Sequence, residues 1–417
     1  MKFTVQSTEL KSVLQLVKVV SDAAAKEKVH AHSVCCMTAD PEANLMTLEF
    51  ALNGSFMSYR FREALLTGSG PAIRRSVDMS VLMGFKFQGP TVEITFDSTD
   101  GGGNKIEFRS GRLRGTATVA ASHIEREIDQ ERATLDRCNL DSTFKIKTLL
   151  DGLACHDYGA HSRVSEPARR PVNIRLQGDH LVFSSQDRIS VGHVKKPVTT
   201  EVAQGFNLHV LAKPLIATLG AIKAGDKTRE EVRFGATKAC WRLQVDTLDL
   251  WFPNMLSDVR ENSERLDQLF AEVDSKPCFK LQFTPESIKS LLTDLAPYMS
   301  NPGLIDNDED PTVQITATAA GTEFSVRTRK ASGNIEADCL VVEDRMQLEP
   351  IEAHRLCLGS RYIEDFAEAL LRYTEKPEDD RLYIVWWPSG DEGSPTKGKV
   401  ACVAYGASRY LCGRLRS

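Results

Sequence analysis

The feature that most constrains the fold is a slow repetition of helix-like segments along the chain. Apolar residues recur at helical spacing in six stretches that start about 65 to 75 residues apart, and strand-like runs follow them. In the first stretch Leu10, Val13, Leu14 and Val17 form one face at i, i+3, i+4 and i+7. The six stretches are 7–20, 77–85, 145–153, 212–224, 284–295 and 360–373. Such regularity predicts a pseudo-repetitive architecture.

The chain length converts this repetition into a domain prediction. Typical domains have about 100 to 150 residues, so 417 residues suggest three domains with two helices each. Polar stretches near 125–141 and 257–276 separate them, and we expect domains at 1–130, 138–262 and 275–417. Hairpin turns between the strands indicate an α+β fold with antiparallel sheets. The clearest strand candidates are 92–96, 105–109, 232–234, 240–245 and 382–387.

Composition limits the class of protein. The chain is 41% hydrophobic and 26% charged, which is typical of a folded globular protein. It has no run of about 18 apolar residues of the kind that a membrane helix needs, and its start has no signal-peptide core, so we expect a cytoplasmic protein without a membrane partner. The ten cysteines include no C-x-x-C pair, which favours reduced, core-filling thiols and no metal or cofactor.

Three short motifs suggest chemistry only weakly. Cys155, His156 and Asp157 have the residue types of a catalytic triad, but triads assemble across a fold rather than from sequence neighbours. The acidic run 306–310 has Pro311 where a calcium loop needs Gly. The glycines at 101–103 lack the following helix of a phosphate-binding loop. None of the three predicts catalysis, so we expect a protein that is not an enzyme.

Lysines recur on the polar faces of several helical stretches. Lys11, Gln15 and Lys18 stand opposite the apolar stripe of the first stretch, with no acid among them. The net charge of −5 excludes DNA binding by overall basicity but permits a local basic face. Such a face is either solvated or a surface for phosphates, and its recurrence favours the second interpretation. Lysines of the other stretches are Lys145, Lys147, Lys213 and Lys223.

Several weak motifs, in order along the chain, resemble the bacterial sliding clamp, the beta subunit of DNA polymerase III. The opening Met1-Lys2-Phe3-Thr4-Val5 is similar to the family's start, and residues 106–114 look like its R-S-G-R strand. Residues 183–191 are similar to its A-T-D-G-H-R-L-A-V strand, 252–254 to its F-P-D-Y turn, and 410–416 to its closing strand. The resemblance implies three similar α+β clamp domains in an arc, each with two helices packed on antiparallel sheets.

The resemblance also implies a function. Two chains would close head to tail into a ring that encircles double-stranded DNA and tethers a DNA polymerase as a processivity factor. Lysines and arginines on the inner surface would contact phosphates without reading the base sequence. The loop cations that the resemblance adds are Lys26, Lys28, Arg169 and Arg170.

Two further sites follow from the resemblance. A pocket would take a short peptide of the polymerase or the clamp loader, at Val172, Ser185, Arg188, Ile189, Pro253, Leu411, Leu415 and Arg416. The ring contact would pair Gly115 and Ala117 with Tyr298 and Met299. Since Gly115 and Ala117 lack the usual apolar bulk, the ring contact loses about 2 to 4 kcal/mol unless another group compensates.

Two other functions are compatible with the sequence. A metal-dependent DNA-processing enzyme on a repetitive scaffold needs a convergent acidic cluster, and the sequence offers none. A clamp-like protein that no longer encircles DNA would bind a partner only. Charge reversal at Lys11 and Lys18 separates this last alternative from a DNA clamp.

Overall fold

The computed structural model describes most of the chain. The description leaves out residues 27–32, 53–54, 69, 97–104, 120–122, 157–170, 187–189, 226, 239, 254–278, 302, 305–310, 319–320, 337–339, 345–353, 360–381, 387–399, 406–407 and 414–417. Its contacts divide the chain into two compact units, each assembled from two segments. Unit 1 is Met1–Leu149 with Val198–Leu256, and unit 2 is Leu150–Pro197 with Ser257–Ser417.

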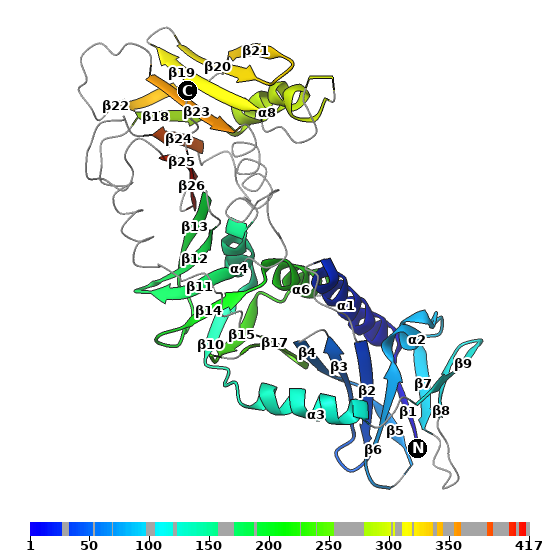
Figure 1. Cartoon of the computed structure of the whole chain (residues 1–417). Helices are drawn as coiled ribbons and strands as arrows, with labels where there is room; N and C mark the ends of the chain where they lie inside the picture. Colours follow the sequence, from blue (N-terminus) through cyan, green and yellow to red (C-terminus); the bar gives the residue numbers. More distant parts are fainter. Residues whose placement is uncertain are drawn as a thin grey trace. The chain divides into compact units, whose positions relative to one another are not determined.

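A five-stranded antiparallel sheet begins unit 1 (Figure 1). Its strands alternate between buried and exposed residues, and Phe3, Ile94 and Phe108 are fully or almost fully buried. The long helix α1 (Ser7–Lys26) contacts β1 and β7. The strands, in the order β5-β1-β7-β8-β9, are β5 (Leu65–Thr67), β1 (Lys2–Gln6), β7 (Thr91–Phe96), β8 (Lys105–Ser110) and β9 (Leu113–Thr118).

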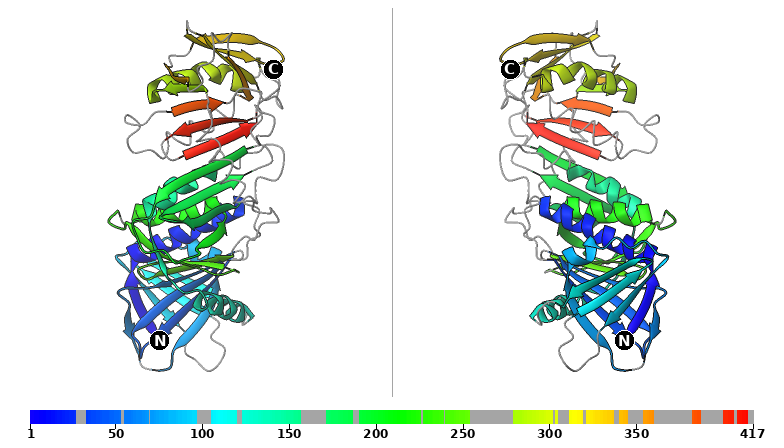
Figure 2. Two further views of the ribbon diagram at one scale, coloured as in Figure 1. Left: turned by 90° about the vertical axis from the view of Figure 1, so that its left-hand side faces the viewer. Right: turned by 90° about the vertical axis from the view of Figure 1, so that its right-hand side faces the viewer.

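The second sheet of unit 1 joins strands from distant parts of the sequence. Strand β17 pairs with β4, so that Leu248 lies opposite Tyr59. The helix α3 (His123–Asp136) contacts β2, β3, β4 and β6 (Figures 1 and 2). The eight strands, in order, are β10 (Ser142–Lys145), β15 (Glu231–Ala236), β16 (Cys240–Val245), β17 (Leu248–Pro253), β4 (Ser55–Arg60), β3 (Leu45–Leu52), β2 (Ser33–Asp40) and β6 (Ile73–Asp78).

Unit 2 contains two antiparallel sheets and the helix α8 (Pro285–Ser300), which begins with a capping box between Thr284 and Ser287. The larger sheet includes, in order, β11 (Val172–Gln177), β12 (His180–Gln186), β13 (Ser190–Pro197), β26 (Ser408–Gly413), β25 (Val400–Tyr405), β24 (Leu382–Trp386), β18 (Phe279–Phe283) and β22 (Leu340–Asp344). The smaller sheet contains β21 (Ser332–Glu336), β20 (Gly321–Arg327), β19 (Thr312–Thr318) and β23 (His354–Gly359).

Five of the six predicted helical stretches are helices in the structure, and the sixth, 360–373, lies outside the described residues. They are α1, α2 (Met79–Gly84), α4 (Ile146–Leu153), α6 (Ala212–Gly225) and α8. The strand β14 (Asn207–Val210) precedes α6. The predicted strands correspond to β7, β8, β15, β16 and β24, and the α+β class with antiparallel sheets is therefore correct. No helix among the described residues is long and apolar enough to cross a membrane.

Candidate nucleic-acid interface

Helix α1 is amphipathic, with the lysines on its outer face. Leu10, Val17 and Val20 are fully buried, whereas Lys11 and Lys18 are exposed. The apolar residues recur at helical spacing, so burying that stripe turns the residues between it toward solvent. The structure thus places both lysines where the periodicity predicts them.

Helix α6 lies against α1 within unit 1 (Figure 2). Leu215 and Leu219 are fully buried, and Lys213 and Lys223 are exposed. Its sequence, AKPLIATLGAIKAG, contains no acidic residue. The two helices together therefore present four lysines at the surface of one compact unit.

The acidic residue at the start of α1 is already engaged. Glu9 Oε1 accepts hydrogen bonds from the hydroxyl of Tyr59, at 2.8 Å, and from the backbone N–H of Arg62, at 3.1 Å. Burial and the Glu9 carboxylate together raise the pKa of Tyr59 to about 12. Glu9 is therefore held at the first turn of α1 by two groups from outside the helix.

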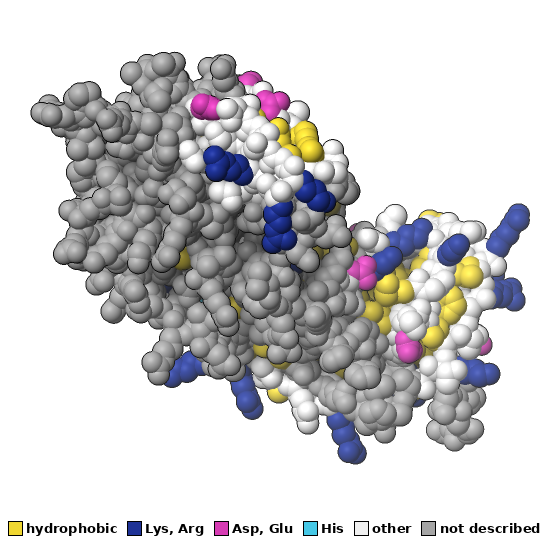
Figure 3. All heavy atoms as spheres, turned by 45° about the horizontal axis from the view of Figure 1, so that its top comes forward, with side chains coloured by type: hydrophobic (Ala, Val, Ile, Leu, Met, Phe, Trp, Pro, Cys, Tyr) yellow, Lys and Arg dark blue, Asp and Glu magenta, His cyan; other side chains and the backbone are white. Residues whose placement is uncertain are grey.

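The remaining cations proposed for DNA contact are placed less completely. Lys145 and Lys147 are exposed where β10 passes into α4. Lys26 is the last residue of α1, but its side chain lies outside the described part. Lys28, Arg169 and Arg170 are outside the described residues. On the face that Figure 3 displays, Lys and Arg side chains lie among uncharged ones, with a few Asp and Glu side chains between them.

Two members of the predicted peptide pocket lie at the same end of one strand pair. The pairing of β11 with β12 sets Asn173 opposite Ser184, and Val172 and Ser185 are the next residues of the two strands. Both are buried. Leu411 belongs to β26, two strands further along the same sheet, and Pro253 is the exposed last residue of β17. Arg188, Ile189, Leu415 and Arg416 are outside the described residues.

The residues predicted at the ring contact have partners inside the chain. A Cβ at Gly115 would overlap the ring of Phe85, and Ala117 is buried. A Cβ at Gly333 of β21 would overlap the hydroxyl of Tyr298, so this side chain covers Gly333. The side chain of Met299 is outside the described part. In both places an aromatic ring lies over a glycine of a strand at the edge of its sheet.

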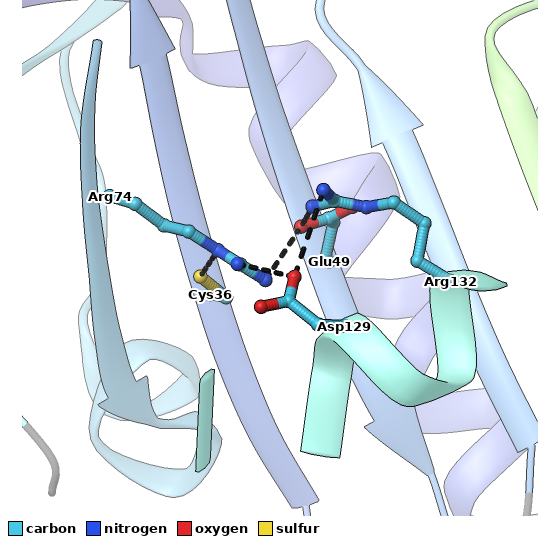
Figure 4. Close-up of polar contacts among 5 residues, drawn as sticks. All are labelled: Cys36, Glu49, Arg74, Asp129 and Arg132. Atoms are coloured by element: carbon cyan, nitrogen blue, oxygen red, sulfur yellow. Dashed lines mark hydrogen bonds and ion pairs between the residues drawn. The ribbon is translucent and has the colours of Figure 1, made fainter. Parts of the chain in front are cut away.

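Helix α3 lies in the polar stretch that the sequence suggested as a domain boundary, and its role was not predicted. Glu49 of β3 is only 2% exposed. It lies between Arg132 of α3 and Arg74 of β6 (Figure 4). Arg132 Nε donates to Glu49 Oε1 at 2.7 Å, and Arg74 Nη1 donates to Asp129 Oδ1 at 2.5 Å. Ile124 and Ile128 stand four residues apart among charged residues, and this spacing is a sequence signal that could have revealed the helix.

The structure also places two of the three residues of the triad-like motif and bears on a metal site. Among the residues that the structure describes, no group of three or more His, Cys, Asp or Glu residues is arranged to hold a metal ion. Cys155 and His156 are buried at the end of α4, and Asp157 is outside the described residues.

Comparison with solved structures identifies the fold as that of the bacterial sliding clamp. The beta subunit from the DNA polymerase of Streptococcus pyogenes matches with a TM-score of 0.70 at 12% identity, covering 100% of both chains. The DNA polymerase sliding clamp from Pseudomonas aeruginosa matches with 0.69 at 11%, also covering 100% of both. The DNA polymerase III beta subunit from Thermotoga maritima matches with 0.68 at 11%, covering 100% of this chain and 99% of the other.

The similarity lies in the fold rather than in the sequence. No family model matches the chain, and no curated protein sequence matches it either. At 11 to 12% identity, a full-length structural match shows that the chain is built on the clamp architecture. The resemblance inferred from weak sequence motifs is therefore confirmed, and the chain is a divergent example of this fold.

Proposed function

We propose that this chain is a DNA sliding clamp, a non-enzymatic processivity factor that encircles double-stranded DNA in the cytoplasm and tethers a DNA polymerase. The observation that carries the proposal is the full-length clamp fold combined with four exposed lysines on the packed helices α1 and α6. The division into three domains, 1–130, 138–262 and 275–417, is part of this proposal.

Lysines on helices suit a ring that must hold DNA and still slide. Each Lys–phosphate contact is independent of base sequence and depends strongly on salt. Because such contacts form equally well at every position along a duplex, they do not stop movement. Lys11, Lys18, Lys213 and Lys223 are the cations whose exposed positions support this role, and the other proposed contacts are Lys26, Lys28, Lys145, Lys147, Arg169 and Arg170.

We infer that the ring closes by strand pairing between two copies. Strands β9 and β21 are each at the edge of their sheet, and an edge strand offers unpaired backbone groups to another chain. Phe85 lies over Gly115 of β9, and Tyr298 lies over Gly333 of β21. Each edge strand is therefore packed against an aromatic side chain of the same chain. Backbone hydrogen bonds then replace the side-chain anchors that Gly115 and Ala117 lack.

The proposed peptide site serves the polymerase and the clamp loader. Val172 and Ser185 lie at the same end of the β11–β12 pair, and this placement supports a site at that end of the two strands. A short peptide with a few apolar anchors gains most of its affinity from such buried contacts. Arg188, Ile189, Pro253, Leu411, Leu415 and Arg416 complete the proposed site.

An order-of-addition experiment on linear DNA tests encirclement without a loader. One end of a duplex is fixed to a bead, and the free end is blocked with a bulky protein either after or before the chain is added. A ring that threads over a free end is trapped only in the first case. The beads are then washed with enough salt to remove Lys–phosphate binding.

We expect salt-resistant retention when the end is blocked after the chain is added, and none when it is blocked before. Cutting the DNA between bead and block should release the retained chain. Equal retention in both orders, or complete loss in both, would contradict encirclement by a closed ring.

A further inference from the structure

Two cysteines from distant parts of unit 1 share one buried cluster. Cys138 lies two residues after α3 and is fully buried, and Cys240, the first residue of β16, is 2% exposed. Both pack in an apolar cluster with Cys36, Ile128 and Trp251. The thiols of Cys138 and Cys240 interact with each other within this cluster, and each shifts the pKa of the other.

The backbone around the pair holds this contact in place. A Cβ at Gly235 of β15 would overlap the carbonyl oxygen of Asn139, so the segment after α3 lies directly on the sheet. Arg242 Nη1 donates to the carbonyl oxygen of Cys138 at 3.3 Å. On the other side, the backbone N–H of Cys240 donates to the hydroxyl of Thr237 at 3.1 Å. The pair is thus fixed by groups from β15, β16 and the turn between them.

The two thiols differ in acidity. Hydrogen bonding to Cys138 and to Thr237 lowers the pKa of Cys240, against the effect of burial. The same thiol–thiol hydrogen bond, together with burial, raises the pKa of Cys138. Cys240 is therefore the more acidic thiol of the pair, and Cys138 is the one that keeps its proton more strongly. Cys36 differs, because burial raises its pKa and its sulfur accepts from Arg74 Nε at 2.9 Å.

We propose that Cys138 and Cys240 are an oxidation site that forms an intramolecular disulfide with hydrogen peroxide as the oxidant. The Cys240 thiolate attacks one peroxide oxygen, the O–O bond breaks, and hydroxide leaves, so that Cys240 becomes a sulfenic acid. The Cys138 sulfur then attacks the Cys240 sulfur. The S–O bond breaks, and water leaves with the proton of Cys138. In total, two thiols and one hydrogen peroxide give one disulfide and two waters.

The path from solvent to the two thiols is short, although both are buried. Arg137 and Asn139, the neighbours of Cys138 in sequence, are exposed, so the thiol lies directly beneath the surface. Hydrogen peroxide is little larger than water and needs only a small local opening of the segment after α3. The disulfide would close a loop of about 100 residues and fasten the end of α3 to the sheet.

Peptide mapping of the full chain tests the proposal directly. The protein is treated with hydrogen peroxide, free thiols are alkylated, and tryptic peptides are analysed by mass spectrometry without reduction. Trypsin places Cys138 in peptide 138–145, Cys240 in 239–242 and Cys36 in 29–60, so every pairing has its own mass. We expect 138–145 linked to 239–242, two hydrogens lighter than the separate peptides, and release of both by dithiothreitol. The matched control is Cys35→Ala, which removes a different buried cysteine, in β2. In this variant Cys138 and Cys240 should link as well as in the wild type.

Two variants and a stability measurement separate the outcomes. In Cys138→Ser, the sulfenic acid of Cys240 has no partner and should be trapped by dimedone. Oxidised wild type should melt about 5 °C or more above the reduced protein, and oxidised Cys138→Ser should not. Alkylation of both peptides after peroxide treatment would overturn the proposal. A disulfide to peptide 29–60 would also overturn it. So would the reverse pattern of sulfenic acids, in which dimedone labels Cys138 in the Cys240→Ser protein but does not label Cys240 in the Cys138→Ser protein.

Discussion

At the scale of single residues, Glu49 is a buried charge of unit 1 that depends on its ion-pair partners. Its carboxylate is 2% exposed, and two arginines from different elements pair with it. A buried charge is tolerated only when it is paired, and removing one partner leaves it unbalanced. Glu49 therefore links the position of α3 to the integrity of the sheet.

Replacing Arg132 with Met should destabilise the protein by about 2 to 3 kcal/mol, because the bidentate partner of Glu49 is lost while Arg74 remains. Urea unfolding followed by circular dichroism measures the change. Arg126→Met, an exposed arginine on the same helix, is the matched control and should change stability by less than about 0.5 kcal/mol. Equal effects of the two substitutions would show that the Glu49 pair contributes nothing specific.

Gly115 is a second residue of interest, because a neighbouring side chain leaves no room for anything larger than glycine at this position. Gly115→Ala should cost about 1 to 3 kcal/mol, because the new Cβ collides with Phe85. In combination with Phe85→Leu the added cost should shrink, since the smaller side chain vacates that space. Gly84→Ala has nothing within 4 Å and serves as the control. Strict additivity of Gly115→Ala and Phe85→Leu in thermal unfolding would contradict the contact.

At the scale of elements, the lysine-bearing helix face can be tested by charge reversal. Lys11→Glu with Lys18→Glu should lower DNA affinity at least about tenfold and reduce the slope of log affinity against log salt by about 2. Fluorescence anisotropy with a labelled duplex at several salt concentrations measures both. The matched control is Lys86→Glu with Lys105→Glu, two exposed lysines outside these helices, which makes the same change in net charge. If both double variants lose affinity equally, net charge rather than the α1 face governs binding.

Helices and strands with a clear apolar period were predictable from sequence. Leu10, Val13 and Val17 repeat at helical spacing and are buried on α1, because local spacing alone decides which face is apolar. Helix α3 was missed, since Ile128 is the one of its described side chains in the buried cluster, and Arg132 and Asp129 form ion pairs with Glu49 and Arg74. Those partners lie more than fifty residues away in sequence, and no local pattern encodes them.

The candidate sites were predictable only in part, for the same reason. Lys11 and Lys18 follow from helical period. The placement of Val172 and Ser185 at one end of a strand pair depends on strand register, and the position of Phe85 over Gly115 depends on tertiary contacts. The thiol pair of Cys138 and Cys240 lies about 100 residues apart in sequence and required the folded sheet to be seen.

At the scale of the whole molecule, the ring closure that we propose depends on the edge strand β9. Gly111, with φ of +59°, and Arg112 form a two-residue turn that makes Ser110 and Leu113 a hydrogen-bonded pair. Hydrogen-bonded and non-hydrogen-bonded pairs alternate along an antiparallel ladder, so the amide of Thr116 points away from β8 toward the free edge. It is therefore available to a second copy.

Thr116→Pro should convert a two-chain ring into single chains, because proline removes that edge donor without removing a bond to β8. Analytical ultracentrifugation measures the mass, and circular dichroism checks that the fold is kept. Thr116→Val keeps the amide and should remain a dimer. A Thr116→Pro protein that is folded and still dimeric would place the contact elsewhere.

The eight-stranded sheet also has a consequence for biosynthesis. Strand β4 ends at Arg60, but its neighbour β17 starts at Leu248, so a ribosome must add most of unit 1 before β4 is covered. Through that interval the nascent polypeptide presents an open hydrogen-bonding edge. Truncated translation products that stop before β17 should accordingly be prone to aggregation, and co-translational chaperones have the strongest reason to act on this stretch.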